Sequence, residues 1–381
     1  MSRICVDARK LADFGIGSYV SRLLMGLAQT DTSHDFLVLA RPPDHDFVRG
    51  LGARFRPIRA TAAEYSLAEQ LALAVKVHRL QPDLYHAPHY VLPASLPCPS
   101  VVTVHDLIHL LYPRFLPNRA AAIYAGWMID RALRRSERVI AVSESTRRDL
   151  VQRCPDRADG LRVIYNGVDE RFRAASRGGP HAAGANELRA GDSSARPYVL
   201  NVGNPKPHKN LDNLLRAWRL AVDRLEGGIE LVCVGAKTDT PSSLIRLRGK
   251  LGLEDSVRFV GHVDDEALVD LYAGAVALVH PSLYEGFGLP VVEAMAAGTP
   301  VITSRGSSLE EIAGDAAILV NPLDLRELAD RMVEITTDPA RRAKLTELGR
   351  ARSKAFSWPK TTQQTLAIYD EILSRSSAPT A

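Results

Sequence analysis

The sequence has few of the features that would place it in several common protein classes. Its four cysteines, Cys5, Cys98, Cys154 and Cys233, are scattered without a CxxC pair, so neither a zinc site nor a disulfide framework is indicated. No apolar stretch reaches the roughly 18–20 residues that a membrane-spanning helix needs. Because the chain runs straight into an apparent strand at 3–6, we expect no signal peptide and a cytoplasmic location.

The balance of residue types is that of an ordinary globular enzyme. Hydrophobic residues make up 46% of the 381 residues and charged residues 24%, close to the globular average. A chain of this length is expected to form two domains. The formal net charge of +4 is compatible with an anionic ligand or membrane surface but does not indicate nucleic acid as a partner.

Short apolar runs alternate with helical patterns along both halves of the chain. Such alternation predicts an α/β fold, with parallel sheets covered on both faces. A stretch rich in Ala, Gly, Ser and Pro interrupts the pattern and predicts a linker. The expected divisions are an N-terminal Rossmann-like domain at 1–175, the linker at 176–196, a C-terminal Rossmann-like domain at 197–356 and a final helix at 357–381. We expect a ligand in the cleft between the two domains.

The stretch from His280 to Pro300 carries the most informative pattern. A buried strand is predicted at 275–279, followed by the turn Gly286-Phe287-Gly288-Leu289-Pro290 and a helix closed by Gly298. A glycine turn at a helix start directs backbone N–H groups at an anion. Glu285 and Glu293 lie on either side of the turn and could accept hydrogen bonds from sugar or ribose hydroxyls; the less favoured alternative is that both are surface carboxylates.

Other polar positions lie where predicted strands end. The loop Gly203–Asn210 contains Lys206, His208 and Lys209, which suits a diphosphate but is also compatible with a solvated loop. His105 and Asp106 follow another strand. His86/His89 and His105/His109 form short histidine motifs that are compatible with a metal site. Motifs this short are commonly false positives, so we do not expect a metal there.

Two further patterns have alternative readings. Gly15-Ile16-Gly17 opens a predicted helix near Ser18 but lacks the third glycine, and the acidic residue, of a dinucleotide-binding fingerprint. A basic cluster is normally a solvated helix face but could hold the protein to anionic lipid. Its members are Arg131, Arg134, Arg135, Arg138, Arg147 and Arg148.

Taken together, these motifs make the chain resemble a retaining glycosyltransferase of family four. The resemblance runs nearly end to end and is carried by Gly15-Ile16-Gly17, Val104-His105-Asp106-Leu107, Val139–Ser145, Asn166–Asp169, the Gly203–Asn210 loop, Phe259–Gly261, Pro281–Pro290 with Glu293, and Phe356-Ser357-Trp358. Within the family the chain is most similar to the branch that includes mannosyl- and rhamnosyltransferases of O-antigen and exopolysaccharide synthesis.

This resemblance implies a GT-B fold that holds a sugar nucleotide mainly on the second domain. Lys209 would bind the diphosphate, Glu293 the ribose and Glu285 the transferred sugar, while Asp106 would position the acceptor. The implied catalytic residues are His105, Asp106 and Glu285. The implied donor-binding residues are Gly15, Gly17, Gly203, Asn204, Lys206, Lys209, Val260, Gly261, His262, Tyr284, Glu285, Gly286, Phe287, Gly288, Leu289 and Glu293. No metal or other cofactor is expected, because cationic side chains and helix N-termini would neutralise the leaving diphosphate.

The expected activity is transfer of a hexose from an NDP-sugar, GDP-mannose or a GDP-deoxyhexose such as GDP-rhamnose first, to a glycan or lipid-linked acceptor. Peripheral contact with the inner face of the plasma membrane is expected through basic helices of the first domain. Asn204, His208 and Ser18 stand where many relatives have arginine, which puts the grip on the donor in question. Two alternatives stay open: an NDP-sugar epimerase of the same fold, and a non-catalytic subunit that binds nucleotide sugars.

Overall fold

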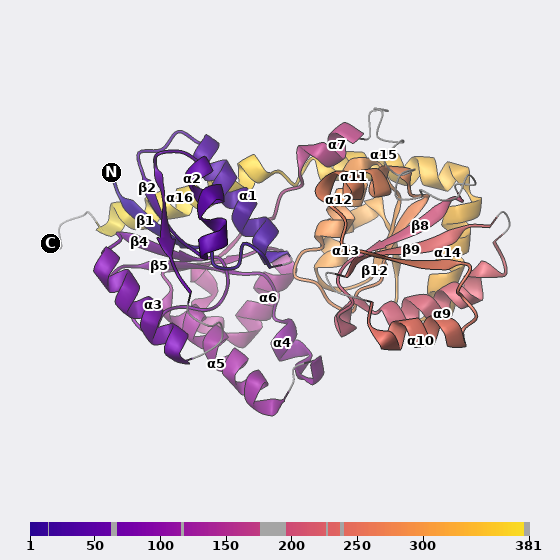
Figure 1. The fold of residues 1–381 in the computed structure, drawn as a ribbon, viewed down its shortest axis with the longest axis horizontal. Helices are drawn as coiled ribbons and strands as arrows, with labels where there is room; N and C mark the ends of the chain where they lie inside the picture. The colour runs from indigo at the N-terminus through magenta and orange to yellow at the C-terminus, as the bar shows by residue number, and fades with distance from the viewer. Residues whose placement is uncertain are drawn as a thin grey trace. The chain divides into compact units, whose positions relative to one another are not determined.

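The computed structural model describes residues 1–13, 15–61, 67–115, 118–175, 196–225, 228–236 and 240–376. The chain forms two compact units, shown in Figure 1. The first unit comprises Met1–Gly167 with Trp358–Ala381, and the second comprises Val168–Ser357. Each unit is built on one sheet whose strands all pair in parallel. The predicted α/β class is confirmed.

The sheet of the first unit has seven strands in the order β3-β2-β1-β4-β5-β6-β7. The strands are β1 (Arg3–Asp7), β2 (Asp35–Ala40), β3 (Phe55–Arg59), β4 (Leu84–Ala87), β5 (Ser100–Val104), β6 (Arg138–Ala141) and β7 (Leu161–Val163). The α-helices are α1 (Ile16–Gln29), α2 (His45–Gly50), α3 (Leu67–Leu80), α4 (Ile108–Leu111), α5 (Arg119–Arg135), α6 (Glu144–Arg153) and α16 (Trp358–Ser376).

Apolar side chains of this sheet alternate between two cores, as successive side chains of a strand must. In β1, Ile4 and Val6 pack into one core with side chains of α1 and α16, whereas Cys5 packs into the other with side chains of α3 and α5. Helices therefore cover both faces of the sheet. The polar ends of the strands are left for the loops that follow them.

The C-terminal helix α16 is an integral part of the first unit. It packs against α1, where a Cβ atom on Gly26 would lie 2.1 Å from Thr362 Oγ1, so only glycine allows this approach. Below it, the fully buried ring of His86 bridges Tyr369 Oη at 2.6 Å and Thr103 Oγ1 at 2.9 Å. The Nδ1 atom of His86 thus joins α16 to the sheet, and Nε2 joins β4 to β5.

The sheet of the second unit has six strands in the order β10-β9-β8-β11-β12-β13. The strands are β8 (Tyr198–Val202), β9 (Glu230–Ala236), β10 (Val257–Gly261), β11 (Ala277–His280), β12 (Val301–Ser304) and β13 (Ile318–Val320). The α-helices are α7 (Glu170–Ala175), α9 (Leu211–Val222), α10 (Ser242–Lys250), α11 (Asp265–Gly274), α12 (Leu289–Ala297), α13 (Ser307–Ala313), α14 (Leu325–Thr337) and α15 (Pro339–Ser353).

Some boundaries differ from those that the sequence predicted. α7 was placed in the first domain, but it belongs to the second unit, where Phe172 packs edge-to-face on Tyr272 at 5.5 Å. α1 begins at Ile16 with Gly15 as its N-cap, so Ser18 does not cap it. α15 was not predicted at all. The linker prediction falls almost wholly outside the described residues, at 176–195.

None of the described helices is both long enough and apolar enough to cross a membrane.

Candidate functional site

The turn between β11 and α12 is the motif that the sequence singled out. α12 begins at Leu289, two residues earlier than predicted, and its N-cap Gly288 is left-handed at φ 104°. A Cβ atom at this glycine would lie 2.7 Å from Leu309 Cδ2, so another residue would strain and crowd the turn. Gly298, at φ 83°, caps the other end of the helix. The predicted glycine turn and C-cap are confirmed.

Hydroxyl groups from β12 and α13 hold the backbone of this turn. They donate to its carbonyl oxygens over 2.6 to 3.0 Å. The donors are Thr303, Ser304 and Ser308, and the acceptors are the carbonyls of His280, Ser282, Glu285 and Phe287. Because the carbonyls are occupied in this way, the turn is fixed before any ligand arrives. The sequence did not single out these hydroxyls.

The loop between β8 and α9 meets this turn from the other side. Lys209 Nζ donates to Glu285 Oε1 over 2.6 Å, and the backbone N–H of Leu283 donates to the carbonyl of His208 over 2.8 Å. Asn210, left-handed at φ 61°, begins α9 and donates to the carbonyl of Pro281 over 3.1 Å. Two residues predicted separately from the sequence, Lys209 and Glu285, therefore lie in direct contact.

Glu285 is ionised despite its position. Burial opposes ionisation, but the positive charge of Lys209 and the hydrogen bond from His280 outweigh it and hold the pKa of Glu285 well below its usual range. The side chains of Lys209 and Glu285 remain 16% and 13% exposed. A charged pair that still reaches solvent at the carboxyl end of a parallel sheet is suited to a polar, anionic ligand.

Glu293 occupies the second turn of α12 and accepts a hydrogen bond from Tyr272 Oη over 2.9 Å. Burial raises the pKa of Tyr272, and the adjacent Glu293 carboxylate raises it further, so the tyrosine stays a donor at neutral pH. Tyr272 lies on α11, which the sequence did not connect with Glu293. The ribose contact assigned to Glu293 stays a prediction.

The proposed base-binding residues lie at the carboxyl end of β10, the edge strand of the sheet. Val260 is half-buried, Gly261 and His262 are exposed, and the register with β9 shifts between Val260 and Gly261. An irregular strand end with exposed backbone can accept a flat ring. No described contact tests this assignment.

The remaining predicted donor-binding residues differ in exposure. Lys206 is exposed, whereas Asn204 is half-buried and its Oδ1 has no hydrogen-bond partner among the described residues. Gly203 has a φ of 152°, and a Cβ atom there would lie 3.7 Å from the stem of Lys209, whereas Gly235 of β9 must be glycine because a Cβ atom on it would lie 2.9 Å from the Gly203 backbone.

Two aromatic side chains of the turn point into the protein. Tyr284 and Phe287 are 6% and 5% exposed, and the ring of Phe287 packs edge-to-face on Phe356 at 5.6 Å. Gly286 between them is buried. Any ligand contact by these three residues must therefore come from the backbone.

In the first unit, His105 follows β5 and its ring is held on both sides. Nε2 donates to the carbonyl of Pro88 over 2.8 Å, and the ring packs edge-to-face on Tyr19 at 4.8 Å. Burial lowers the pKa of His105, so the neutral ring carries its proton on Nε2 and presents Nδ1 as an acceptor. Asp106 Oδ1 accepts the backbone N–H of Ile108 over 3.0 Å and so shapes the start of α4.

The glycines before α1 serve different purposes. A Cβ atom on Gly17 would lie 2.2 Å from the carbonyl oxygen of Leu11, so the packing of the β1–α1 loop already requires glycine there. Gly15 is left-handed at φ 69° and a Cβ atom there would meet nothing within 4 Å. Their predicted contact with the sugar-nucleotide donor stays a prediction.

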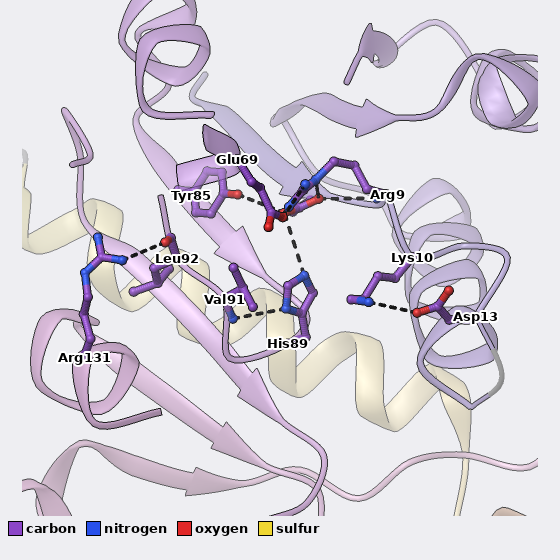
Figure 2. A network of polar contacts seen from close by, with 10 residues as sticks. Arg9, Lys10, Asp13, Glu69, Tyr85, His89, Val91, Leu92 and Arg131 are labelled. Atoms are coloured by element: carbon purple, nitrogen blue, oxygen red, sulfur yellow. Dashed lines mark hydrogen bonds and ion pairs between the residues drawn. The ribbon is translucent and has the colours of Figure 1, made fainter. Parts of the chain in front are cut away.

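A buried charged network, which the sequence did not reveal, lies where β1 and β4 end (Figure 2). Arg9 pairs with Asp7 over 2.7 Å and with Glu69 over 2.6 Å, and Tyr85 Oη donates to Asp7 over 3.2 Å. The backbone N–H of Val91 donates to His89 Nδ1, so the Nε2 of that neutral ring carries the proton and faces Asp7 from 3.9 Å. These contacts join the β1–α1 loop to α3.

The network predicts an acid dependence of stability. Burial opposes ionisation of Asp7, but Arg9 outweighs it and lowers the pKa to about 2 from the ordinary value of 3.8. Because the folded pKa lies below the unfolded one, the stabilisation is present above about pH 4 and disappears as the pH falls toward 2. We expect the unfolding free energy lost in D7N to shrink by about 2 kcal/mol over that interval.

Urea unfolding of wild type and D7N at several pH values measures this difference. The matched control is D46N, because the Asp46 carboxylate is 92% exposed and should change the unfolding free energy little at any pH. A D7N difference that stays constant from pH 4 to pH 2 would contradict this account of the network.

The histidine motifs that raised the question of a metal have other partners. His86 is bonded through both ring nitrogens, and burial lowers its pKa to about 3. Within the described ranges, no group of three or more His, Cys, Asp or Glu side chains is arranged to hold a metal ion.

The sequence matches two protein-family models. Residues 15–172 match the model described as Glycosyltransferase Family 4, and residues 188–352 match Glycosyl transferases group 1. O-antigen chain mannosyltransferase B of Escherichia coli is 30% identical over 286 residues, which span 75% of this chain and 74% of that protein. O-antigen chain mannosyltransferase RfbU of Salmonella typhimurium is 29% identical over 272 residues, which span 71% of this chain and 69% of that protein.

Among solved structures, HepE of Anabaena in complex with UDP-glucose matches with a TM-score of 0.78 at 20% identity, over 97% of this chain and 100% of that one. At this identity the likeness concerns the fold alone, and the predicted GT-B class with two Rossmann-like domains is confirmed. The two family models and the 30% identical relative establish more than the fold. The chain belongs to the family 4 glycosyltransferases, and it is an enzyme that transfers glycosyl groups.

Proposed function

We propose that this glycosyltransferase moves a hexose, with retention of anomeric configuration, from an NDP-sugar to a glycan or lipid-linked acceptor in cell-surface polysaccharide synthesis. The observation that carries the proposal is the contact between Lys209 and Glu285 at the carboxyl edge of the second sheet. The ammonium group of Lys209 is suited to a diphosphate, and the carboxylate of Glu285 is suited to sugar hydroxyls. Together they match the two parts of a sugar nucleotide on either side of the bond that breaks.

Each group has a defined part in the proposed reaction. An ammonium group has three donors, so Lys209 can keep its bond to Glu285 and offer two protons to diphosphate oxygens. The start of α12 adds backbone N–H groups. Glu293 would hold the ribose, and the base would lie against Val260, Gly261 and His262. These residues are proposed to neutralise the leaving diphosphate without a metal ion.

Retention is proposed to follow from attack on the face that the diphosphate leaves. The acceptor oxygen bonds to the anomeric carbon as the bond from that carbon to the phosphate oxygen breaks. The hydroxyl proton passes to the departing phosphate. In the first unit, His105 Nδ1 is proposed to accept a hydrogen bond from a sugar hydroxyl, and Asp106 to contact the acceptor. No side chain then needs to act as a nucleophile.

A mannosyl donor carried on GDP is our first choice. Two curated relatives are named as O-antigen chain mannosyltransferases, which supports mannose and a lipopolysaccharide-type acceptor. The structurally similar HepE was solved with UDP-glucose, so the test must include other bases and sugars. Asn204 and His208 replace arginines common in the family, and we propose that Lys206 takes over part of their role.

The proposal is tested by incubating the protein with GDP-mannose, GDP-rhamnose, UDP-glucose or ADP-glucose, with and without a membrane extract that contains lipid-linked glycans. The expected result is a product with the donor's anomeric configuration, identified by NMR, formed only when acceptor is present. An isomerised donor formed without acceptor would instead support the epimerase alternative. Donor binding without any transfer would contradict the proposed activity.

We also propose that α4 and α5 rest on an anionic membrane. Three large apolar side chains are exposed there: Leu111 at 46%, Ile123 at 74% and Trp127 at 50%. Ile123 and Trp127 are four residues apart on one helix face and line an open hollow of about 490 Å³. Apolar side chains beside cationic ones are typical of helices that lie in the membrane interface.

The charge of this region supports the same partner, although the basic cluster predicted from the sequence is smaller than expected. From residue 108 to 135 the chain has five arginines and one aspartate, a net charge of +4, equal to that of the whole chain. However, Arg131 donates to Gln70 and to the carbonyl of Leu92, and Arg138 pairs with Glu371. These two side chains are structural, whereas Arg134 is 60% exposed and pairs over 3.0 Å with Asp156, which is 62% exposed.

Vesicle sedimentation tests the membrane contact. We expect binding to vesicles rich in phosphatidylglycerol but not to pure phosphatidylcholine, and the double variant I123S/W127S should bind about tenfold more weakly because it loses two apolar anchors. The control is L323S in the second unit, where Leu323 is 65% exposed. Equal binding by I123S/W127S and wild type would contradict the proposal.

A further inference from the structure

His280, the last residue of β11, is a buried polar side chain in the second unit. It is 1% exposed, and its carbonyl accepts a hydrogen bond from Thr303 Oγ1 of the neighbouring strand over 2.9 Å. The imidazole ring is therefore held at the end of β11, where the turn that carries Glu285 begins. No role for His280 is predicted from the sequence.

The ring contacts the proposed sugar-binding carboxylate. His280 Nε2 lies 3.2 Å from Glu285 Oε1 and 3.2 Å from Ser282 Oγ. Burial lowers the pKa of His280, and an ionised carboxylate can only accept, so the neutral ring carries its proton on Nε2 and donates it to Glu285. Among the described residues, the side chains with polar atoms within hydrogen-bond distance of this ring are Glu285 and Ser282, and Lys209 bonds the same oxygen of the carboxylate.

Both donors to Glu285 act on the same oxygen. Lys209 Nζ and His280 Nε2 both approach Oε1, whereas no side chain or backbone group of the described residues donates to Oε2. A lysine alone fixes a carboxylate poorly, because its stem is flexible and its ammonium group is a point charge. A second donor from a strand end, on a ring held by packing, determines which way the carboxylate faces.

We propose that His280 is a positioning residue that acts through Glu285. By sharing Oε1 with Lys209, it turns Oε2 toward the hexose of the donor, where that oxygen accepts hydrogen bonds from sugar hydroxyls. This inference rests on the proposed function and deepens it, because it separates the grip on the sugar from the grip on the nucleotide. Lys209 contributes to binding both the nucleotide and the sugar of the donor, whereas His280 contributes to binding the sugar alone.

If His280 only filled space in the core, a histidine would not be required at this position. A leucine fills a similar buried volume without a polar group that must be satisfied. Glutamine, in contrast, carries an N–H donor at a reach similar to that of Nε2 and could restore the bond to Oε1. The three residue types therefore distinguish a positioning role from a packing role.

The experiment compares H280L, H280Q and the control V279A, whose side chain is also buried in β11 but packs in the apolar core of the unit. Turnover of the NDP-sugar and calorimetric binding of the sugar-free NDP are measured for each. We expect H280L to lower kcat about 10-fold, since a mispositioned catalytic contact costs of that order, while the Kd for the NDP stays unchanged. H280Q should recover most of the activity, and V279A should lose stability without losing kcat.

A double-mutant cycle identifies the route of the effect. If His280 acts through Glu285, H280L/E285A should turn over no more slowly than E285A alone. Independent, additive losses, an equal loss of NDP affinity, or wild-type kcat in H280L would each overturn the inference. In those cases the wild type still transfers hexose and the proposed function stands. A wild type that transfers hexose from no sugar nucleotide would overturn both.

Discussion

Replacing Lys209 with methionine is expected to lower kcat/KM for the sugar nucleotide about 10²–10³-fold, the usual cost of removing one preorganised donor from a developing negative charge. The methionine keeps the apolar stem but removes all three ammonium protons. Of these, one holds Glu285 Oε1 over 2.6 Å and the other two are assigned to the diphosphate. Because the leaving group gains charge as the bond breaks, kcat should fall as well as donor affinity.

The control for this variant is K250M, which removes an exposed lysine from the end of α10 in the same unit. It matches the change in charge without touching the site. Steady-state kinetics with both proteins, together with calorimetry of the sugar-free NDP, separate the local effect from the change in net charge. If K209M retained wild-type affinity for the NDP, Lys209 would not be a diphosphate ligand.

Replacing Glu285 with glutamine is expected to lower kcat about 10²-fold or more while leaving the affinity for sugar-free NDP nearly unchanged, because a misplaced donor leaves a sugar hydroxyl unpaired. The amide has the same shape as the carboxylate, and its oxygen can still accept from Lys209 and His280. Its nitrogen would then stand where Oε2 accepts the hydroxyl. The loss is therefore one of chemistry on the sugar and not of packing.

The matched control for E285Q is E266Q, at an exposed carboxylate in the first turn of α11. Parallel kinetics of E285Q and K209M should give two different patterns: a kcat defect alone for the glutamate, and a combined kcat and affinity defect for the lysine. Identical patterns would contradict the division of labour between the sugar and the diphosphate.

Local patterns predicted the elements of the site well. The turn with Gly288 and the end of the helix at Gly298 require left-handed backbone conformations. Glycine is the residue that adopts them most readily, so both positions can be recognised from the sequence. The same holds for Lys209 in its loop after β8. The helix α7 was not predicted, and its residues were included in the first domain, because a six-residue segment shows too little periodicity to reveal which core it joins.

Contacts between distant residues could not be predicted in this way. Arg9 and Glu69 are 60 positions apart, and the α3 carboxylate looks like any first-turn acid until the fold buries it. Likewise, nothing in the sequence connects Tyr272 with Glu293. α15 was missed although Asp338 before Pro339 is a typical helix start, because few of its side chains are buried and its apolar periodicity is weak.

Calorimetric titration can measure whether the second unit holds an NDP-sugar through Lys209 and Glu285. Wild type and K209M would each be titrated with GDP, UDP, ADP and their hexose derivatives. We expect one sugar nucleotide to bind the wild type at micromolar Kd and to bind K209M at least about tenfold more weakly. Equal affinity of both proteins for that ligand, or no binding of any sugar nucleotide to the wild type, would contradict it.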